Sequence, residues 1–187
     1  MGDVCAMGEG EGMSMGSLEW VPARTRSDLL ADPVATAVGA LEADDVRVAE
    51  IDPGLSDTAV FCERYGVRMD ESANCVIVSG RRNGQVRHAA CLVLAAARID
   101  VNGVVRKWLD VRKVSFAPQE EAVSLTGMEY GGITPLGLPD DWPVLVDEAV
   151  AAHPGVVIGS GVRRSKLAVS GALLGGLKGA EVLRLAG

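Results

Sequence analysis

The chain has 187 residues, carries a formal net charge of -7, and is 48% hydrophobic and 23% charged. This length suits one ordinary domain with a hydrophobic core, and the composition excludes a disordered chain, a collagen-like fibre and a long coiled coil. Three Trp, two Tyr and two Phe are too few for the repeated stacking platforms of single-strand nucleic-acid binders.

The N-terminal segment, residues 1–16, is rich in Gly, Met and Glu and has no apolar periodicity. This composition predicts a disordered tail. Apolar residues then recur at spacings of three and four over residues 28–41, which predicts an amphipathic helix. Residues 46–51 form a predicted strand. We therefore expect one globular domain over residues 17–187, which begins with this helix and strand in residues 17–55.

Capping residues mark the next helix. Ser56 and Asp57 are suited to begin a helix that runs to Tyr65, and Gly66 is a residue type that ends helices. The β-branched run at residues 74–78 predicts a strand.

A hairpin is expected to follow this strand. Residues 81–84, with the sequence Arg-Arg-Asn-Gly, predict a tight turn into a second strand at residues 86–94. A helix over residues 100–109 and a strand at residues 114–116 are expected next.

The most clearly delimited helix lies between Pro118 and Gly127, with two glutamates at the positive end of its dipole. Residues 127–143 then contain four glycines and three prolines, which predicts a shaped loop. Short strands at residues 144–146, 156–158 and 167–169, and a helix after Ser170, complete the chain. Short strands and helices interleaved without a strict βαβ rhythm predict a mixed α/β (α+β) fold.

Neither a membrane span nor a metal site is expected. The longest apolar run, residues 89–97, is well short of the roughly 20 residues that a spanning helix needs. Acidic residues stand where a secretory signal would be basic, which favours a cytoplasmic protein. The four cysteines form no C-x-x-C pair and the two histidines no zinc spacing, so we predict free thiols, no metal and no cofactor.

Charge is unevenly distributed along the chain. Residues 1–73 hold 5 basic and 15 acidic side chains, whereas residues 74–187 hold 13 basic and 10 acidic ones. Several of these later cations form short clusters. Such clusters have two interpretations, a solvated surface or a face that contacts phosphates. The clusters are Arg81-Arg82 with Arg87, Arg106-Lys107, Arg112-Lys113, and Arg163-Arg164 with Lys166.

Common catalytic signatures are absent. The sequence has no G-x-S-x-G elbow, no phosphate-binding G-x-x-x-x-G-K-[ST] loop and no H-E-x-x-H, and only a truncated G-x-G at Gly159 and Gly161. Neither histidine has a nearby Ser or Cys in sequence, which disfavours a nucleophile triad. Dinucleotide binding is likewise unsupported.

The glycine- and proline-rich loop and the strands after it carry a family resemblance. GMEYGGITPLGLP, followed by PVLVDEAV and VVIGSGVRRSKLAVS, resembles the YbaK/EbsC family of aminoacyl-tRNA editing domains, which is related to the insertion domain of bacterial prolyl-tRNA synthetases. The resemblance covers about residues 56–183 and places an editing-type domain at residues 56–187. It implies a mixed, barrel-like sheet flanked by helices.

The resemblance also implies an activity, partners and a site. The family hydrolyses the ester of mischarged aminoacyl-tRNA, so aminoacyl-tRNA is the implied substrate and an aminoacyl-tRNA synthetase a candidate partner. Hydrolysis needs a held water, donors for the oxyanion and a shaped pocket, which a glycine loop stiffened by proline can help to form. The residues that match the family's motifs are Gly131, Gly132, Ile133, Thr134 and Pro135 in the loop, Asp147 after a strand, and Gly159, Ser160 and Gly161 in a later turn.

Matching the strand ANCVIV puts Asn74 where deacylases of this family carry a lysine. Together with Gly131 and Pro135, Asn74 forms the expected catalytic set, and the other matched residues the expected substrate contacts. Asparagine can hydrogen-bond the ribose or amino group but brings no cation. Two functions therefore stay open. One is a trans-editing deacylase whose basic clusters meet tRNA. The other is a catalytically silent module that binds an amino acid, a nucleotide or another protein.

Overall fold

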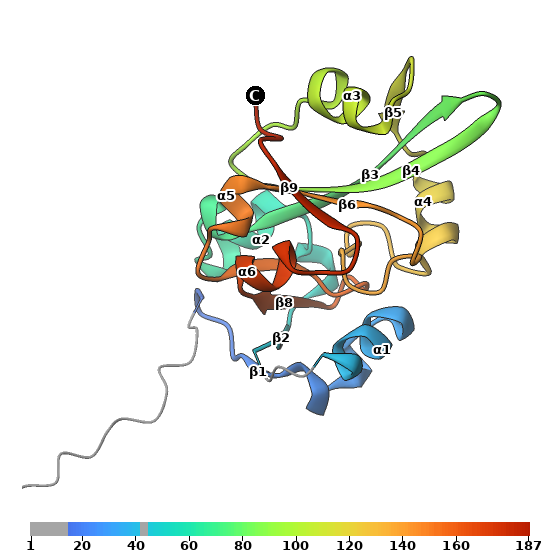
Figure 1. Cartoon of the computed structure of the whole chain (residues 1–187). Helices are drawn as coiled ribbons and strands as arrows, with labels where there is room; N and C mark the ends of the chain where they lie inside the picture. Colours follow the sequence, from blue (N-terminus) through green and yellow to red (C-terminus); the bar gives the residue numbers. More distant parts are fainter. Residues whose placement is uncertain (1–14, 42–44) are drawn as a thin grey trace, which may run out of the picture.

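The computed structural model describes residues 15–41 and 45–187 and contains two sheets with short helices around them (Figure 1). The strands are β1 (Val21–Pro22), β2 (Arg47–Glu50), β3 (Ala73–Arg82), β4 (Gln85–Leu94), β5 (Val114–Phe116), β6 (Val144–Asp147), β7 (Val156–Gly159), β8 (Ser165–Val169) and β9 (Ala180–Leu183). The α-helices are α1 (Asp32–Ala40), α2 (Thr58–Tyr65), α3 (Arg106–Leu109), α4 (Gln119–Thr126), α5 (Glu148–Ala151) and α6 (Gly171–Gly175).

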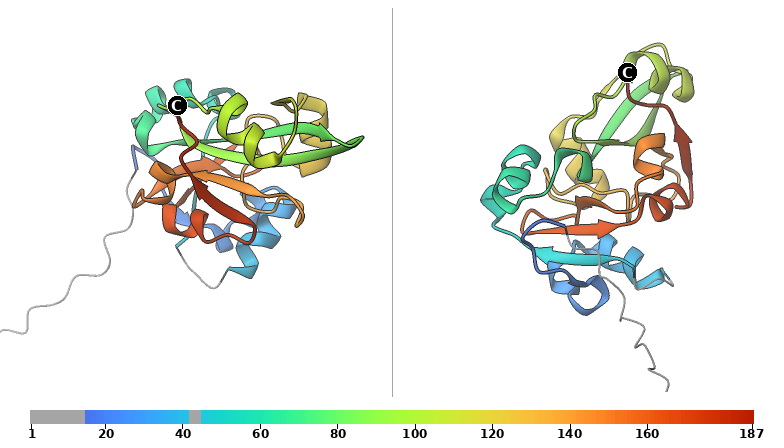
Figure 2. Two further views of the ribbon diagram at one scale, coloured as in Figure 1. Left: turned by 45° about the horizontal axis from the view of Figure 1, so that its top comes forward. Right: turned by 90° about the vertical axis from the view of Figure 1, so that its left-hand side faces the viewer.

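The first sheet has the order β1-β2-β8-β7 and is antiparallel throughout. The second has the order β5-β3-β4-β6-β9, in which β4, β6 and β9 run parallel to one another. An isolated bridge between Ser72 and Val157 joins the two sheets. The long β3–β4 hairpin extends beyond the body of the molecule, as Figure 1 and the left view of Figure 2 show.

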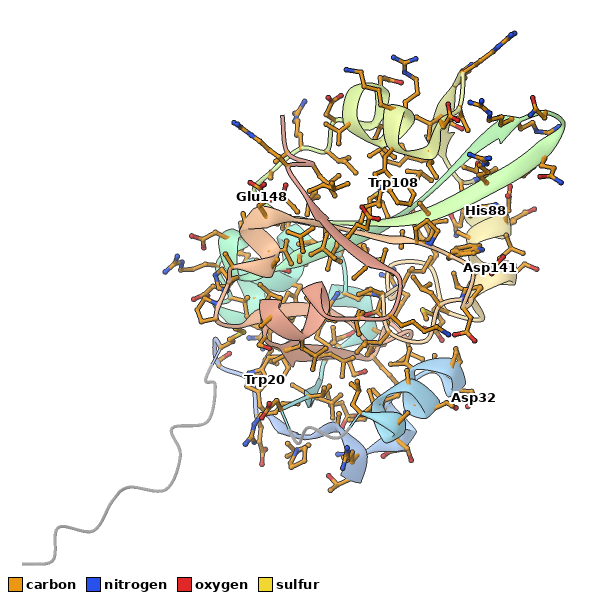
Figure 3. All side chains as sticks on the ribbon, viewed as in Figure 1. Trp20, Asp32, His88, Trp108, Asp141 and Glu148 are labelled. Carbon is orange, nitrogen blue, oxygen red and sulfur yellow. The ribbon has the colours of Figure 1, made fainter. Side chains whose placement is uncertain are left out.

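The main core lies between the two sheets, and alternate side chains of their strands point into it. In β4, Ala90 and Leu92 join the main core, whereas Ala89, Cys91 and Val93 face a second cluster beneath α3. Successive side chains of a strand point to opposite faces, so one strand serves both layers. Trp108, labelled in Figure 3, packs against the second cluster and donates through Nε1 to Glu181 Oε2 at 3.1 Å.

A third cluster holds α2 against the first sheet. Phe61 and Cys62 of α2 pack with Val157 and Ala168, on the face of that sheet opposite to the side chains of Leu167 and Val169. Met15 belongs to this third cluster. The tail expected over residues 1–16 therefore extends too far toward the domain. Met15 is buried, and Ser17 N–H donates to Tyr65 O at 2.8 Å. Residues 1–14 lie outside the described residues.

Most expected elements are present, with shifted ends. The helix expected over residues 28–41 begins at Asp32, and the strand expected at 74–78 extends to Arg82. In the expected 100–109 helix, residues Val101–Val105 form a π-helical turn, and the Asp100 carboxylate accepts from the N–H groups of Gly103 and Val104. Asn83 and Gly84 have φ values of 52° and 81°, which suits the two-residue hairpin turn that the sequence predicts.

Three short elements were not predicted: β1, α5 and β9. The mixed α+β class is confirmed, but the two sheets are not closed into a barrel. The two sheets remain separate because β7 packs near β3 without forming a ladder with it, and a single isolated bridge links Val157 of β7 to Ser72, the residue before β3. Over the described residues, no helix combines the length and apolarity needed to cross a membrane.

Candidate active site

A pocket of about 360 Å³ opens where α2, β3, β7, β8 and the glycine loop meet. The lining includes the apolar side chains of Ile77, Ala122, Ile133 and Ile158. Polar residues from three separate segments also line the pocket. These are Ser56, Asp57 and Thr58 at the start of α2, Ser72 and Asn74 at the start of β3, and Lys166 in β8. Pockets of this size with a few convergent polar groups are typical of small-molecule sites.

The glycine loop contributes Gly131 and Ile133 to the pocket and is held by close backbone packing. Gly131 has a φ of 82°, a left-handed conformation that favours glycine, and a Cβ there would lie 2.5 Å from Arg163 Nη1. A Cβ at Gly132 would lie 2.8 Å from the backbone of Val162. The loop therefore requires glycine at both positions.

The second glycine segment supports the first. Gly161 N–H donates to Gly132 O at 2.7 Å, and Glu129 N–H donates to Gly161 O at 2.8 Å. A Cβ at Gly159 would overlap the Gly132 carbonyl, so β7 and the loop can approach only because Gly159 has no side chain. The structure thus brings the two glycine motifs expected from sequence into direct contact.

Asn74 lies in the pocket wall with Gly131 and Ile133, where the sequence interpretation puts it. Its Oδ1 accepts a hydrogen bond of 2.7 Å from Thr58 Oγ1. Because Oδ1 is engaged in this way, the side-chain amide nitrogen keeps its two donors for a ligand. The helix α2 thereby fixes the orientation of the amide at the pocket wall.

Lys166 is a site residue that sequence reasoning missed. It is 7% exposed, and its Nζ donates to Ser56 O at 2.8 Å and lies 5.2 Å from the centre of the Phe61 ring. Burial, reinforced by the charge of Arg163, lowers the pKa of Lys166 to about 8. A lysine inside the apolar strand SKLAV was the available signal, but its position beside Arg163 and Arg164 made it look like part of a surface cluster.

Two buried hydroxyls have no hydrogen-bond partner within the described part of the chain, Ser56 Oγ and Thr134 Oγ1. Buried polar groups are almost always paired, so each such exception needs an explanation. Ser56 lines the pocket, and the backbone carbonyl of the same residue accepts from Lys166. Thr134 is fully buried and does not line the pocket.

Several expected site residues lie behind the pocket lining. Of the expected contacts, Asn74, Gly131, Ile133 and Gly159 line the pocket, whereas Gly132, Thr134, Pro135, Ser160, Gly161 and Asp147 do not. Ser160 Oγ lies within hydrogen-bonding distance of Val162 O, Ser165 O and Ser165 Oγ, and Ser165 Oγ within that of Leu29 O. Each hydroxyl can donate its one proton to one of these acceptors at a time. This buried network holds the turn between β7 and β8 against the segment before α1.

Asp147 is 3% exposed, and its carboxylate accepts hydrogen bonds of 2.9 to 3.0 Å from the N–H groups of Ala149, Leu185 and Ala186. It caps α5 and ties down the C-terminal segment, away from the pocket lining. We expect Asp147→Ala to lower the free energy of unfolding by about 2–3 kcal/mol, since three backbone donors lose a charged acceptor. Urea denaturation measures this. A substrate contact would instead raise KM without loss of stability.

The expected phosphate-contacting residues do not form one face. Arg81, Arg82 and Arg112 surround a cavity of about 610 Å³ at the hairpin tip, together with Arg106, and Lys113 adjoins them. Arg163 instead lies at the glycine loop, where its guanidinium donates to Asp57 Oδ1, Pro53 O and Tyr130 O. Arg164 donates to Asp28 O. Both of these arginines hold loops of the protein together.

Metal ligation finds no support in the part of the chain that the structure describes, where no group of three His, Cys, Asp or Glu side chains could hold an ion. The three described cysteines, Cys62, Cys75 and Cys91, are free thiols. Burial raises the pKa of Cys91 to about 12 and also raises that of Cys75, which lines the pocket. A neutral buried thiol is a poor nucleophile, so the pocket offers no activated cysteine.

The sequence profile of the aminoacyl-tRNA editing domain matches residues 52–175, and the chain belongs to this family. A solved structure described as a candidate trans-editing enzyme for prolyl tRNA synthetase is similar to it, with a TM-score of 0.72 and 22% identity over 84% of this chain and 96% of that one. A hypothetical protein, APE2540, has a TM-score of 0.67 and 24% identity over 76% and 91% of the two chains. At these identities the two likenesses show the fold alone.

Proposed function

We propose that the protein is a free-standing deacylase that hydrolyses the ester of mischarged aminoacyl-tRNA. A water oxygen bonds to the ester carbonyl carbon, and the bond from that carbon to the ribose oxygen breaks. The ribose oxygen takes one proton of the water, the other proton passes to solvent, and the amino acid leaves as its carboxylate. The observation that carries the proposal is the pocket itself, which the glycine loop, Asn74 and Lys166 line together with apolar side chains.

The mixed lining of the pocket suits the two parts of an aminoacyl ester. Ile77, Ala122, Ile133 and Ile158 supply a surface against which an amino-acid side chain can be buried. The polar lining residues offer donors to the ester and to the ribose, among them the amide nitrogen of Asn74. A ligand with an apolar end and a polar, hydrolysable end fits this lining.

Two exposed aromatic rings line the same pocket and suit the terminal nucleotide. Tyr130 is 55% exposed and Phe116 is 58% exposed. Exposed aromatic side chains are platforms on which unpaired bases stack. Although the chain has too few aromatic residues for a long stacking track, two at one pocket are sufficient for the single base next to an aminoacyl group.

The hairpin tip supports contacts to the rest of the tRNA. Strand β3 has Asn74 near its pocket end and Arg81 and Arg82 at its other end. At roughly 3.3 Å per residue, Arg81 lies about 23 Å from Asn74 along the strand. Nitrogen-tipped side chains gather around this tip and α3 in Figure 3. Arg82 is paired with Asp110, whereas Arg81 and Arg112 form no ion pair with a carboxylate of the described residues.

We expect tRNA binding to weaken steeply as salt rises, because each phosphate contact releases counterions. The double substitution Arg81→Gln with Arg112→Gln should weaken binding to all tRNAs. It should also reduce the magnitude of the slope of log K against log salt concentration by about 1 for each phosphate that is no longer bound. Filter binding or fluorescence anisotropy over a salt series measures both quantities.

Lys178→Gln is the matched control because Lys178 is exposed and lies between α6 and β9. It removes one positive charge outside the hairpin tip. An equal change in slope from this control, or no change from the double substitution, would show that the tip makes no phosphate contacts.

Purified protein incubated with a panel of tRNAs charged with different amino acids tests the activity. The proposal predicts release of amino acid from at least one mischarged tRNA faster than spontaneous hydrolysis. A protein that binds these tRNAs and deacylates none of them is instead the silent binding module that Asn74 left open.

A further inference from the structure

Lys166 supplies the positive charge of the pocket lining. Among the lining residues, all of which belong to the described ranges, it is the single cation and Asp57 the single carboxylate. Strand β8 pairs Lys166 with Gly159 of β7, the glycine that lets the 131–133 loop approach. The ammonium therefore enters the pocket beside the loop that the sequence marks as the site.

A packing role alone does not account for a lysine at this position. Its Nζ makes one hydrogen bond, to Ser56 O, and forms no ion pair among the described residues. An ammonium has three donors, so two are left without a protein acceptor. Burying a cation with so little compensation is unfavourable, and an apolar side chain of similar length would fill the same space at lower cost.

The neighbouring hydroxyl is also without a partner among the described residues. Ser56 Oγ is buried and unpaired, although the carbonyl of the same residue binds Lys166. A Cβ built on Gly131 would lie 3.6 Å from Ser56 Oγ, so the hydroxyl lies next to the glycine loop. Unsatisfied donors from β8 and from the segment just before α2 thus line the same pocket and are linked through the backbone of Ser56.

We propose that the Lys166 ammonium and the Ser56 hydroxyl bind the carbonyl oxygen of the substrate's ester and stabilise the negative charge that develops on it. This inference rests on the proposed deacylase function and assigns the oxyanion-binding groups of that site. When water adds to the carbonyl carbon, the carbonyl electron pair moves onto this oxygen. It returns when the bond to the ribose oxygen breaks.

The pH dependence follows from the groups that face Lys166. Arg163 and burial favour the neutral amine, whereas Asp57 and the Phe61 ring favour the ammonium, and the Cys62 thiol is kept neutral by burial. The balance lowers the pKa of Lys166 to about 8. The ammonium is therefore present below about pH 8 and is lost above it, so kcat/KM, divided by the rate of spontaneous hydrolysis, should fall above that pH.

Three variants test the assignment in the deacylation assay. Lys166→Gln should lower kcat about 100-fold with little change in KM, the size typical of losing one oxyanion donor. Lys166→Arg keeps the charge at all pH values, so its residual activity should lack the decline above pH 8. Ser56→Ala should lower kcat about 10-fold without lowering the melting temperature, because its hydroxyl binds nothing within the described part of the free protein. Lys178→Gln is the control lysine.

The assignment is overturned if Lys166→Gln keeps the wild-type kcat, or if Lys166→Arg shows the wild-type pH decline. A second readout separates this outcome from failure of the proposed function. The side-chain NMR signal of Lys166 is followed while a non-hydrolysable amide analogue of aminoacyl-adenosine is added. A shift on binding supports the contact even if no charged tRNA is hydrolysed. Saturation with the analogue without any shift contradicts it even if the protein is an active deacylase.

Discussion

Gly159→Ala is expected to reduce deacylation about 100-fold and to lower the free energy of unfolding by about 1–3 kcal/mol. The added methyl group overlaps the Gly132 carbonyl, and the atom it meets is backbone that cannot rotate away. The glycine loop must therefore move off β7, and a displacement of about 1 Å at a catalytic loop is sufficient for a loss of this size. Single-turnover deacylation and urea denaturation measure the two effects.

Gly39→Ala is the matched control for this substitution. Gly39 lies in α1, where a Cβ would meet no atom within 4 Å, and it has an ordinary helical backbone. Alanine there should keep full activity and raise stability by up to about 1 kcal/mol. If Gly159→Ala keeps wild-type activity while its stability falls, the contact between β7 and the loop is structural only and the site lies elsewhere.

Asn74→Ala is expected to lower deacylation by about 10- to 1,000-fold, the range for loss of one positioning or oxyanion-type contact. The substitution removes the amide donors from the pocket wall and leaves Thr58 Oγ1 without its acceptor. Stability should fall by only about 1 kcal/mol because a single part-buried hydrogen bond is lost. Steady-state kinetics on one mischarged tRNA measures the activity.

Thr58→Val separates the orientation of the Asn74 amide from its presence. It removes the same hydrogen bond but keeps Asn74, so it should cost less activity than Asn74→Ala. Asn102→Ala, at an exposed position in the π-helical turn, should have no effect. Equal activity of Asn74→Ala and the wild type would remove Asn74 from the site.

Local signals in the sequence were sufficient for most of the fold. The Asn83-Gly84 turn, Gly66 at the end of α2 and Gly127 at the end of α4 each adopt the left-handed backbone conformation that glycine or asparagine favours. The elements that were missed are two to four residues long. Such segments contain too few residues to show a period of 2 or 3.6, and their formation depends on neighbours that are distant in sequence.

The barrel-like sheet was expected from the family resemblance and not from any residue pattern. Closure depends on whether the terminal strands of a sheet pair with each other, which no local signal reports. Here the β-pairing between β7 and the second sheet is limited to one isolated bridge at Ser72, and β5 and β9 remain edge strands. The sequence interpretation was therefore correct on class and incorrect on closure.

The residues of the candidate site were likewise predictable only in part. The glycine loop, Asn74 and Gly159 could be identified because they lie in recognisable motifs, and the structure brings them to one pocket. Lys166 and Ser56 could not, because a buried lysine and a buried hydroxyl are distinguished from surface residues only by the packing around them. Asp147 matched a motif position, but its carboxylate is occupied by the backbone of the C-terminal segment.

The most direct test of the account compares wild type, Gly159→Ala and Gly39→Ala side by side on one mischarged tRNA at about pH 7, where Lys166 is charged. The account predicts that the wild type and Gly39→Ala release the amino acid at equal rates well above spontaneous hydrolysis, and that Gly159→Ala is slower by about 100-fold. Release at the spontaneous rate by the wild type on every charged tRNA, or equal release by all three proteins, would contradict it.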